Sequence, residues 1–259
     1  MRSPGKWQGK VVVVTGGGGG IGRAVSHQFA QEGASVVVVD RTFEISNLVC
    51  QEITNKGLSA IAMGADVSSE PDVRSVVQDT ILQLGRIDVL VNNAAVCPQV
   101  RTTDMTLETW NQVITNNLTS VFLLCREAIP HMIRGGGGAV VNVSSVHALA
   151  TLDGYSAYAA SKGGIVAMSR AMALDFAKDK VRVNIVLPGA IHTPMLESSV
   201  KGLDTPREQI MQEWDAAQPI GRVGQPEEVA AVILFAASPD NSFMTGATLV
   251  VDGGMTIEL

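Results

Sequence analysis

Short runs of β-branched residues alternate along the chain with longer segments in which apolar residues recur every three or four positions. The runs are expected to be strands and cover residues 11–14, 35–39, 87–92, 139–143, 181–187 and 248–251. The longer segments are expected to be helices and cover residues 21–32, 70–84, 107–133, 156–178 and 226–236. This alternation is typical of βαβ units and a parallel sheet. Residues 34–39 are apolar at nearly every position, as in a strand buried on both faces, so we predict a Rossmann-type α/β fold, a doubly wound parallel sheet with helices on both faces.

No Pro/Ser-rich linker divides the sequence, and the glycine run at 135–138 falls where a helix must turn into a strand. We therefore expect one domain over residues 1–259. Its cofactor-binding half would span about 10–135 and its catalytic and substrate-binding half about 136–259. Residues 191–221 are long enough to form a lid over the site.

Composition excludes several classes of protein. The chain has 25 acidic and 19 basic residues, a net charge of −6 and no Lys/Arg cluster, so nucleic acid is not an expected partner. Cys50, Cys97 and Cys125 lack metal-ligand or disulfide spacing and are interpreted as reduced thiols, so no metal site is expected. No apolar run has the length of a membrane span or signal peptide. We expect a cytoplasmic protein with no membrane partner.

A glycine-rich turn follows the first expected strand and opens the first expected helix. It reads Thr-Gly-Gly-Gly-Gly-Gly-Ile-Gly over residues 15–22. That context is required of a turn whose backbone approaches a dinucleotide pyrophosphate, although a glycine run can also be a flexible loop. The register is ambiguous, because Gly17, Gly19 and Gly22 satisfy one dinucleotide-binding spacing whereas Gly16, Gly20 and Gly22 satisfy another.

Asp40 closes the second expected strand and predicts the choice of cofactor. A carboxylate at this position accepts hydrogen bonds from the adenosine ribose hydroxyls of NAD and repels the 2′-phosphate of NADP. Arg41 follows directly and could serve a 2′-phosphate, so NADP is the less favoured alternative. A solvated aspartate at a strand end is the plainer interpretation of Asp40.

Tyr158 and Lys162 are four residues apart in an expected helix, which places a phenol and an ammonium on one helix face. Ser145 follows the strand 139–143, so its hydroxyl should emerge at the carboxyl edge of the sheet, where open α/β sheets bind ligands. An ordinary pair on a helix surface is the alternative. The three positions together favour catalysis at that edge.

With these motifs the chain resembles the short-chain dehydrogenase/reductase family. Within that family its sequence is similar to those of aldose, fucose and hydroxysteroid dehydrogenases. The resemblance covers nearly the whole chain. Its motifs are the turn 15–22, Asp66-Val67, Asn92-Asn93-Ala94-Ala95, Asn117-Leu118, Ser144-Ser145, the Tyr158 to Lys162 pair, Pro188-Gly189 with Thr193, and Asp252-Gly253-Gly254. Ala95 departs from the family's usual glycine and adds one methyl group, which should be tolerated.

The resemblance implies roles for individual residues. It selects Gly16, Gly20 and Gly22 as the register of the turn and implies Tyr158 as the acid/base, with Lys162, Ser145 and Asn117 as the other catalytic members. The residues expected to contact the cofactor are Gly16, Gly20, Ile21, Gly22, Asp40, Arg41, Asp66, Val67, Asn93, Ala94, Tyr158, Lys162, Pro188, Gly189, Ile191 and Thr193.

Physical chemistry gives the catalytic residues the same roles. A phenol has a pKa of about 10, and a neighbouring ammonium together with an oxidised nicotinamide should favour the phenolate of Tyr158. Ser145 can hydrogen-bond the reacting oxygen, and Lys162 has donors for the nicotinamide ribose. Asn117 is expected to hold, through its side chain, a water molecule that links Lys162 to solvent. A polar residue that bends the helix is the alternative for Asn117.

The substrate should be selected by residues 96–103, 146–154 and 191–221, because loops at strand ends vary on a fixed scaffold. The side chains expected to contribute are Gln99, His147, Asp153 and Met195, with His192 and Glu197 as further polar members. Their polarity favours a sugar or polyol. We therefore expect an NAD-dependent enzyme that interconverts a secondary alcohol or cyclic hemiacetal with its carbonyl.

Three alternatives to this function stay open. One is an NADPH-dependent oxoacyl-thioester reductase, which normally has a basic residue inside the glycine turn. A hydroxysteroid reductase is another, and a non-catalytic NAD-binding regulator is a third, of a different class. The apolar faces of 107–133 and 156–178 further predict a homotetramer.

Overall fold

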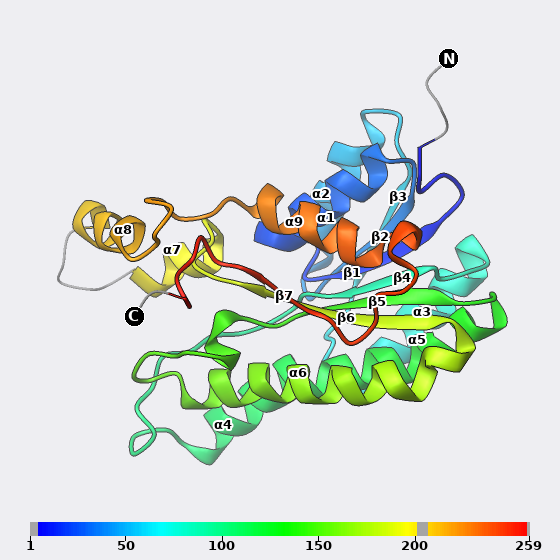
Figure 1. The fold of residues 1–259 in the computed structure, drawn as a ribbon. Coiled ribbons are helices and arrows are strands. Elements are labelled where there is room, and N and C mark those ends of the chain that lie inside the picture. Colours follow the sequence, from blue (N-terminus) through cyan, green and yellow to red (C-terminus); the bar gives the residue numbers. More distant parts are fainter. Residues whose placement is uncertain (1–4, 201–206, 258–259) are drawn as a thin grey trace.

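The computed structural model describes residues 5–200 and 207–257, and its centre is a seven-stranded parallel sheet. The strands are β1 (Val11–Thr15), β2 (Ser35–Asp40), β3 (Ala60–Gly64), β4 (Val89–Asn92), β5 (Gly138–Val143), β6 (Val181–Pro188) and β7 (Thr248–Val251). They lie in the order β3-β2-β1-β4-β5-β6-β7, and every adjacent pair is parallel (Figure 1). The order reverses at β1 and β4, which gives the doubly wound topology predicted from the sequence.

Helices cover both faces of the sheet (Figure 1). One layer contains α1 (Gly20–Gln31), α2 (Phe43–Thr54) and α9 (Pro226–Ala237). The other contains α3 (Glu70–Leu84), α4 (Leu107–Ile114), α5 (Ser120–Arg134) and α6 (Ser156–Phe176). Successive strand residues point to opposite faces, so Val12 and Val14 of β1 pack under the first layer while Val11 and Val13 pack under the second. The uninterrupted valine run is therefore explained by burial on both sides.

Some elements were not predicted from the sequence. The strand β3 was missed because it lies at the sheet edge, is only partly buried and contains Ala and Gly, which disfavour strands. The helix α2 was missed because exposed apolar residues, including Phe43 and Leu48, blur its amphipathic pattern. The short helices α7 (Pro194–Val200) and α8 (Arg207–Ala216), which lie together at one end of the molecule in Figure 1, were missed within the expected lid segment.

The helix expected over residues 107–133 is interrupted. A π-helical turn at Thr115–Thr119 separates α4 from α5. The extra residue in such a turn changes which side chains face the core, and π-helical turns are frequent at functional sites. Apolar spacing alone carries no signal for it, so the sequence indicated one continuous helix.

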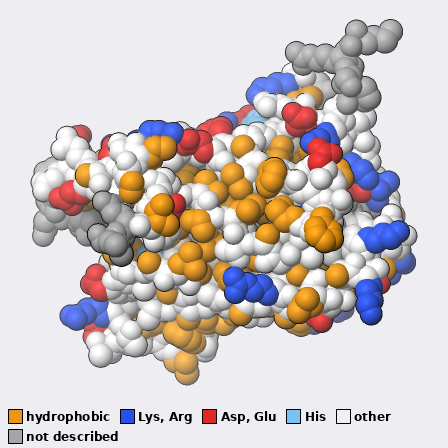
Figure 2. Space-filling view, viewed as in Figure 1, with side chains coloured by type: hydrophobic (Ala, Val, Ile, Leu, Met, Phe, Trp, Pro, Cys, Tyr) orange, Lys and Arg blue, Asp and Glu red, His pale blue; other side chains and the backbone are white. Residues whose placement is uncertain are grey.

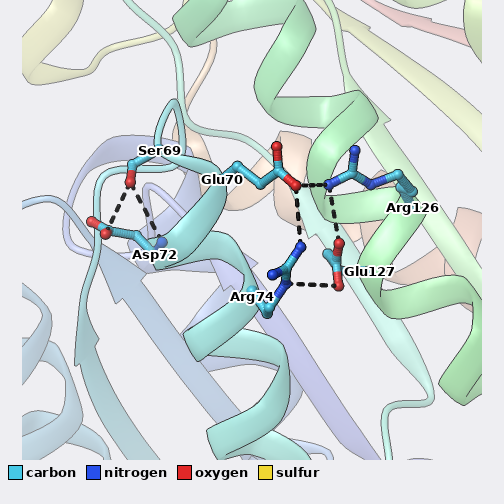
Figure 3. A network of polar contacts seen from close by, with 6 residues as sticks. All are labelled: Ser69, Glu70, Asp72, Arg74, Arg126 and Glu127. Atoms are coloured by element: carbon cyan, nitrogen blue, oxygen red, sulfur yellow. Dashed lines mark hydrogen bonds and ion pairs between the residues drawn. The ribbon is translucent and has the colours of Figure 1, made fainter.

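A network of exposed charges joins α3 to α5 (Figure 3). Glu70 accepts hydrogen bonds from Arg74 at 3.2 Å and from Arg126 at 2.7 Å, and Arg126 also donates to Glu127 at 3.1 Å. Exposed pairs of this kind contribute little to the stability of a fold, because solvent screens them. Packing of the two helices, not this network, therefore holds the layer in place. Within the described ranges, no helix has the length and apolar character needed to cross a membrane.

Candidate active site

The carboxyl ends of β1, β4, β5 and β6 meet at one edge of the sheet, and the predicted site residues follow these ends. Ser145 comes two residues after β5, and α6 brings Tyr158 and Lys162 against the same edge. The side chains of Tyr158 and Ser145 are hydrogen-bonded to each other. Lys162 donates from Nζ to the Val143 carbonyl at 3.0 Å, and its Nζ lies 5.4 Å from the centroid of the Tyr158 ring. The three residues predicted to act together are thus adjacent.

Burial controls the electrostatics of this cluster. It raises the pKa of Tyr158 well above its ordinary value, and Cys97 adds to that effect while the Ser145 hydrogen bond opposes it. Burial also lowers the pKa of Lys162 to about 8. The sequence predicts a phenolate favoured by the Lys162 ammonium together with an oxidised nicotinamide, and burial opposes the contribution of the ammonium. The phenol is an acid here and needs further positive charge nearby before it can serve as a base.

Asn117 lies in the π-helical turn and is fully buried. Its Oδ1 accepts from the Val96 N–H at 2.8 Å, and its Nδ2 donates to the Val96 carbonyl at 2.9 Å and to Ser161 Oγ at 3.1 Å. Ser161 in turn donates to the Tyr158 carbonyl at 2.7 Å. Protein groups thus take three of the four hydrogen-bonding positions of this side chain, and its holding of a water molecule stays a prediction. Its neighbour Asn116 instead donates to the Gln112 carbonyl within its own helix.

The glycine turn between β1 and α1 forms an open cradle. Gly16 and Gly20 adopt φ values of +60° and +48°, which favour glycine, and a Cβ at Gly22 would lie 2.0 Å from the Gly16 carbonyl oxygen. Nothing lies within 4 Å of a Cβ placed at Gly19. The register Gly16, Gly20 and Gly22 is therefore the one in which the backbone requires glycine.

The neighbourhood of this turn suits an anion. No side chain caps the N-terminus of α1, so its first N–H groups can face a ligand phosphate. Ile21 lies in that first turn and packs against the core. Asn93 braces the loop by donating to the carbonyls of Thr15 at 3.1 Å and Gly16 at 3.2 Å, and the Ala94 N–H donates to Thr15 Oγ1.

Asp40 reaches back to the glycine turn, where its Oδ2 accepts from the Gly18 N–H at 3.2 Å. A Cβ at Gly18 would lie 2.9 Å from that oxygen, so the carboxylate fills the space beside the turn. Arg41 is exposed, and its charge helps to lower the pKa of Asp66. Asp66 itself is engaged in its own loop by hydrogen bonds from the Ser68 N–H and Oγ. The adjoining Val67 is buried in the core.

The segment after β6 adjoins the other side of the cradle. Pro188 ends β6, and Gly189 is packed so closely that an added Cβ would meet Asp252 at 2.8 Å. Ile191 is buried and pairs with Gly224 in a parallel bridge. A Cβ at Gly20 would lie 3.0 Å from Thr193 Cγ2, so Thr193 stands against the glycine turn.

Of the side chains expected to select the substrate, the structure brings His147 against Tyr158, with ring centroids 5.4 Å apart. Gln99 is exposed and donates to the Asp153 carbonyl at 3.4 Å, while the Asp153 side chain faces solvent. Met195 is exposed on α7. Glu197 is paired with Arg207 at 2.6 Å and with His192 at 3.5 Å, so the lid charges interact with each other.

Two residues of the site were missed from the sequence. Tyr155 precedes Tyr158 by three positions, and its ring centroid lies 6.4 Å from that of Tyr158 and 4.8 Å from that of His147. That spacing, which puts side chains on one helix face, was the available signal. Cys97 influences the ionisation of Tyr155, Tyr158 and Lys162, so it shares their surroundings. In the sequence it lies within the segment 96–103 expected to select the substrate, but the side chain itself was interpreted only as a reduced thiol.

A doubly wound parallel sheet with this turn and this Tyr-Lys-Ser cluster defines the class of nicotinamide-dependent oxidoreductases that act on CH–OH groups. Within that class, the chain belongs to the short-chain dehydrogenase/reductase family. A family model described as enoyl-(acyl carrier protein) reductase matches residues 16–256.

Curated relatives match nearly the whole chain. The 3-oxoacyl-(acyl-carrier-protein) reductase FabG of Thermotoga maritima is 39% identical over 251 residues, which is 96% of this chain and 99% of that protein. The cyclohexanol dehydrogenase of Acinetobacter sp. is 36% identical over 252 residues, 97% of this chain and 96% of that protein.

Two solved structures superimpose closely on this chain. A short-chain dehydrogenase/reductase from Burkholderia xenovorans superimposes with a TM-score of 0.95 at 34% identity, covering 98% of this chain and 99% of that one. Levodione reductase does so with a TM-score of 0.94 at 34% identity, covering 98% of this chain and 100% of that one.

Proposed function

We propose that the protein is an NAD-dependent oxidoreductase that interconverts a secondary alcohol and its ketone, with Tyr158 as the general acid/base. The observation that carries this proposal is the Ser145–Tyr158 hydrogen bond beside the buried ammonium of Lys162. A proton donor and a hydrogen-bond donor then converge where one substrate oxygen can contact both.

The nicotinamide, when bound, accepts or supplies the hydride. Ser145 donates a hydrogen bond to the substrate oxygen, and Tyr158 exchanges a proton with it. Lys162 holds positive charge against the phenol, which stabilises the phenolate when the alcohol is oxidised. The glycine turn, Thr193 and the uncapped end of α1 would hold the cofactor.

Asp40 supports NAD as the cofactor. Its carboxylate lies beside the glycine turn, where it would accept hydrogen bonds from ribose hydroxyls and repel a 2′-phosphate. Residues 17–19 of the turn are all glycine, so no basic side chain there offers a phosphate contact. Arg41 stays the residue that would bind a 2′-phosphate if NADP were preferred.

A second candidate function is reduction of an oxoacyl thioester, because the FabG relatives of Thermotoga maritima and Chlamydia muridarum are 39% and 38% identical. The sugar or polyol favoured by the sequence is supported less well than a less polar alcohol, since Gln99 and Glu197 are engaged with protein partners. A non-catalytic regulator is disfavoured because Ser145, Tyr158 and Lys162 are all present.

The test is a cross-panel of initial rates with the purified protein. Cyclohexanol, 2-hexanol, a hydroxysteroid, free aldoses and polyols are assayed with NAD and NADP, and acetoacetyl thioester is assayed with NADH and NADPH. We expect NADH formation from secondary alcohols. Reduction of the thioester with NADPH as the fastest reaction would overturn the proposal in favour of the second candidate.

A further inference from the structure

We infer that Tyr155 and His147 form an aromatic wall beside Tyr158 that selects compact alicyclic secondary alcohols, such as cyclohexanol, over open-chain, polyhydroxylated or charged substrates. This inference rests on the proposed function, because it names the substrate class of the same site. The side chains of these two residues together are the aromatic wall.

The geometry of the aromatic wall is set by its two backbone anchors. His147 lies in the short 3-10 turn Val146–Ala148, and its N–H donates to Ser145 Oγ at 3.2 Å. Tyr155 is the residue before α6, one helical turn ahead of Tyr158. The two rings are 4.8 Å apart and tilted by 51°, and the His147 ring meets the Tyr158 ring edge to face at 5.4 Å. At these distances aromatic rings stabilise each other, so the rings hold one another in a defined arrangement.

The position of the aromatic wall relative to the reacting oxygen follows from the same contacts. Ser145 and Tyr158 fix where a substrate oxygen binds, and the aromatic wall adjoins both of them through His147. The carbon skeleton attached to that oxygen must therefore pass close to the rings. A saturated ring can lay its C–H groups on the rings, whereas an open chain makes fewer contacts and loses more conformational freedom.

The two rings of the aromatic wall are uncharged, and the carboxylate that acts on Tyr155 is that of Asp153, which would repel an anionic substrate. Burial lowers the pKa of His147 and raises that of Tyr155, so both are neutral near pH 7. Burial also raises the pKa of the neighbouring Cys97 thiol to about 11. A substrate carboxylate or phosphate placed here would lose its hydration without gaining a partner at the aromatic wall, which is costly.

Beyond the Tyr155 hydroxyl and one His147 ring nitrogen, the aromatic wall offers no partners to a hydroxyl-rich substrate. His147 Nδ1 is within 2.8 Å of Thr151 Oγ1, so one of its two ring nitrogens is engaged. Gln99 donates to the Asp153 carbonyl at 3.4 Å, so part of its amide is engaged as well. Each sugar hydroxyl buried without a partner weakens binding. An alicyclic alcohol has a single polar group, which Ser145 and Tyr158 satisfy.

The experiment compares the substrate preference of Tyr155→Ala, measured as kcat/KM, with that of wild type. We expect wild type to prefer cyclohexanol to 2-hexanol and sorbitol in kcat/KM. In Tyr155→Ala, the KM for cyclohexanol should rise by roughly tenfold, the loss expected for one aromatic contact surface, while 2-hexanol is affected much less. Tyr155→Phe, which keeps the ring, should keep the preference, and Tyr155→Leu, which keeps apolar bulk without the ring, should lose part of it. Leu82→Ala, a highly exposed position on α3, is the control for unrelated substitution.

Binding is measured separately from turnover in the Tyr158→Phe background. Cyclohexanone is titrated calorimetrically into the protein–NADH complex, with and without Tyr155→Ala, and 2-hexanone is the comparison ligand. A selective weakening of cyclohexanone by roughly tenfold supports the aromatic wall even if turnover is undetectable. Equal losses for both ketones, or a wild type that prefers sorbitol or an aldose, would overturn it. Absence of any turnover by wild type together with selective cyclohexanone binding would count against the proposed function alone.

Discussion

Asn117 holds Val96 by both polar groups of its backbone. The Val96 N–H donates to Asn117 Oδ1 at 2.8 Å, and Asn117 Nδ2 donates to the Val96 carbonyl at 2.9 Å. A side-chain amide thus replaces the strand partner that this segment loses beyond the end of β4. Through Ser161 the same amide is joined to the backbone of Tyr158. The loop bearing Cys97 and the helix bearing Tyr158 are therefore positioned by one residue in a π-helical turn.

Replacing Asn117 should damage both stability and the site. Asn117→Leu leaves the Val96 N–H and carbonyl without their partners, and each such loss costs about 1–3 kcal/mol. We expect a lower free energy of unfolding in urea and at least a roughly tenfold lower kcat, with NAD affinity less affected. The matched control is Asn116→Leu, which removes one contact within the helix. Equal effects of the two variants would show that Asn117 has no special positioning role.

The second prediction concerns the proton transfer itself. Tyr158→Phe removes the hydroxyl that is bonded to Ser145 but keeps the ring that packs against His147. Loss of a general acid/base typically lowers rates by about 10²–10⁴-fold. We expect kcat to fall by that order while NAD binding, measured by calorimetry, is largely kept. Turnover near the wild-type rate would remove Tyr158 from the mechanism.

The sequence predicted the features of the site that depend on residue spacing and strand ends, and it missed those that depend on packing. Tyr158, Lys162 and Ser145 were found because spacing and strand ends determine where such side chains emerge. The contact of Asn117 with Val96 was missed because the two residues are 21 positions apart and a π-helical turn has no sequence signature. The rise in the pKa of Tyr158 was missed because burial depends on the packed structure. The fold was easier to predict, since continuous valine runs dictate a two-sided sheet. The elements that were missed are the edge strand β3 and the helices α2, α7 and α8, whose apolar patterns are weak or blurred by exposed apolar residues.

Asp40 provides the test of cofactor choice. Asp40→Asn keeps an oxygen that can accept from the Gly18 N–H but removes the charge that opposes a 2′-phosphate. We expect the ratio of kcat/KM for NADP to that for NAD to rise, by roughly tenfold if about 1.4 kcal/mol of repulsion is relieved. Glu44→Gln, an exposed carboxylate in the first turn of α2, controls for the change in net charge. A wild type that already prefers NADP would transfer the deciding role to Arg41.

The depressed pKa of Lys162 predicts a pH-dependent stability. The folded protein releases this proton at about pH 8, whereas the unfolded chain keeps it to about pH 10.5. Between these values the unfolded state binds more protons, so this residue makes folding more favourable as pH rises. The penalty for burying the ammonium is fully present below pH 8 and is gone above pH 10.5. It is on the order of 3 kcal/mol.

The measurement is a pair of urea titrations at pH 7.5 and pH 10 on wild type and Lys162→Met. Other titrating groups cancel in the difference between the two proteins. We expect wild type to gain about 2–3 kcal/mol relative to Lys162→Met across this range. The exposed Lys178→Met variant should show no such relative change. A wild type that loses stability relative to Lys162→Met would mean that the ammonium is stabilised in the folded protein.

The surface also bears on assembly, because apolar side chains are exposed on several helices. Phe235 of α9 and Val250 of β7 are 52% and 43% exposed, on a face where Figure 2 shows apolar side chains gathered over these two elements. Leu107 of α4 and Leu174 of α6 are 73% and 81% exposed. The latter two lie on the helices that the sequence predicted to pair. Exposed apolar groups that gather on one face favour association.

The last prediction is that the protein is a homotetramer that associates in part through α4, α5 and α6. Light scattering at micromolar concentration should give about four times the chain mass of 27.2 kDa, as expected for closed symmetric association. Introducing charge by Leu174→Glu together with Leu107→Glu should shift the protein to a smaller species, because a carboxylate buried at an apolar contact lacks a partner. Leu82→Glu is the matched control, since Leu82 is 84% exposed on α3, outside the helices expected to pair. A wild-type species of 27.2 kDa would contradict association altogether, whereas an unchanged tetramer in the double variant would transfer the contact to the face formed by α9 and β7.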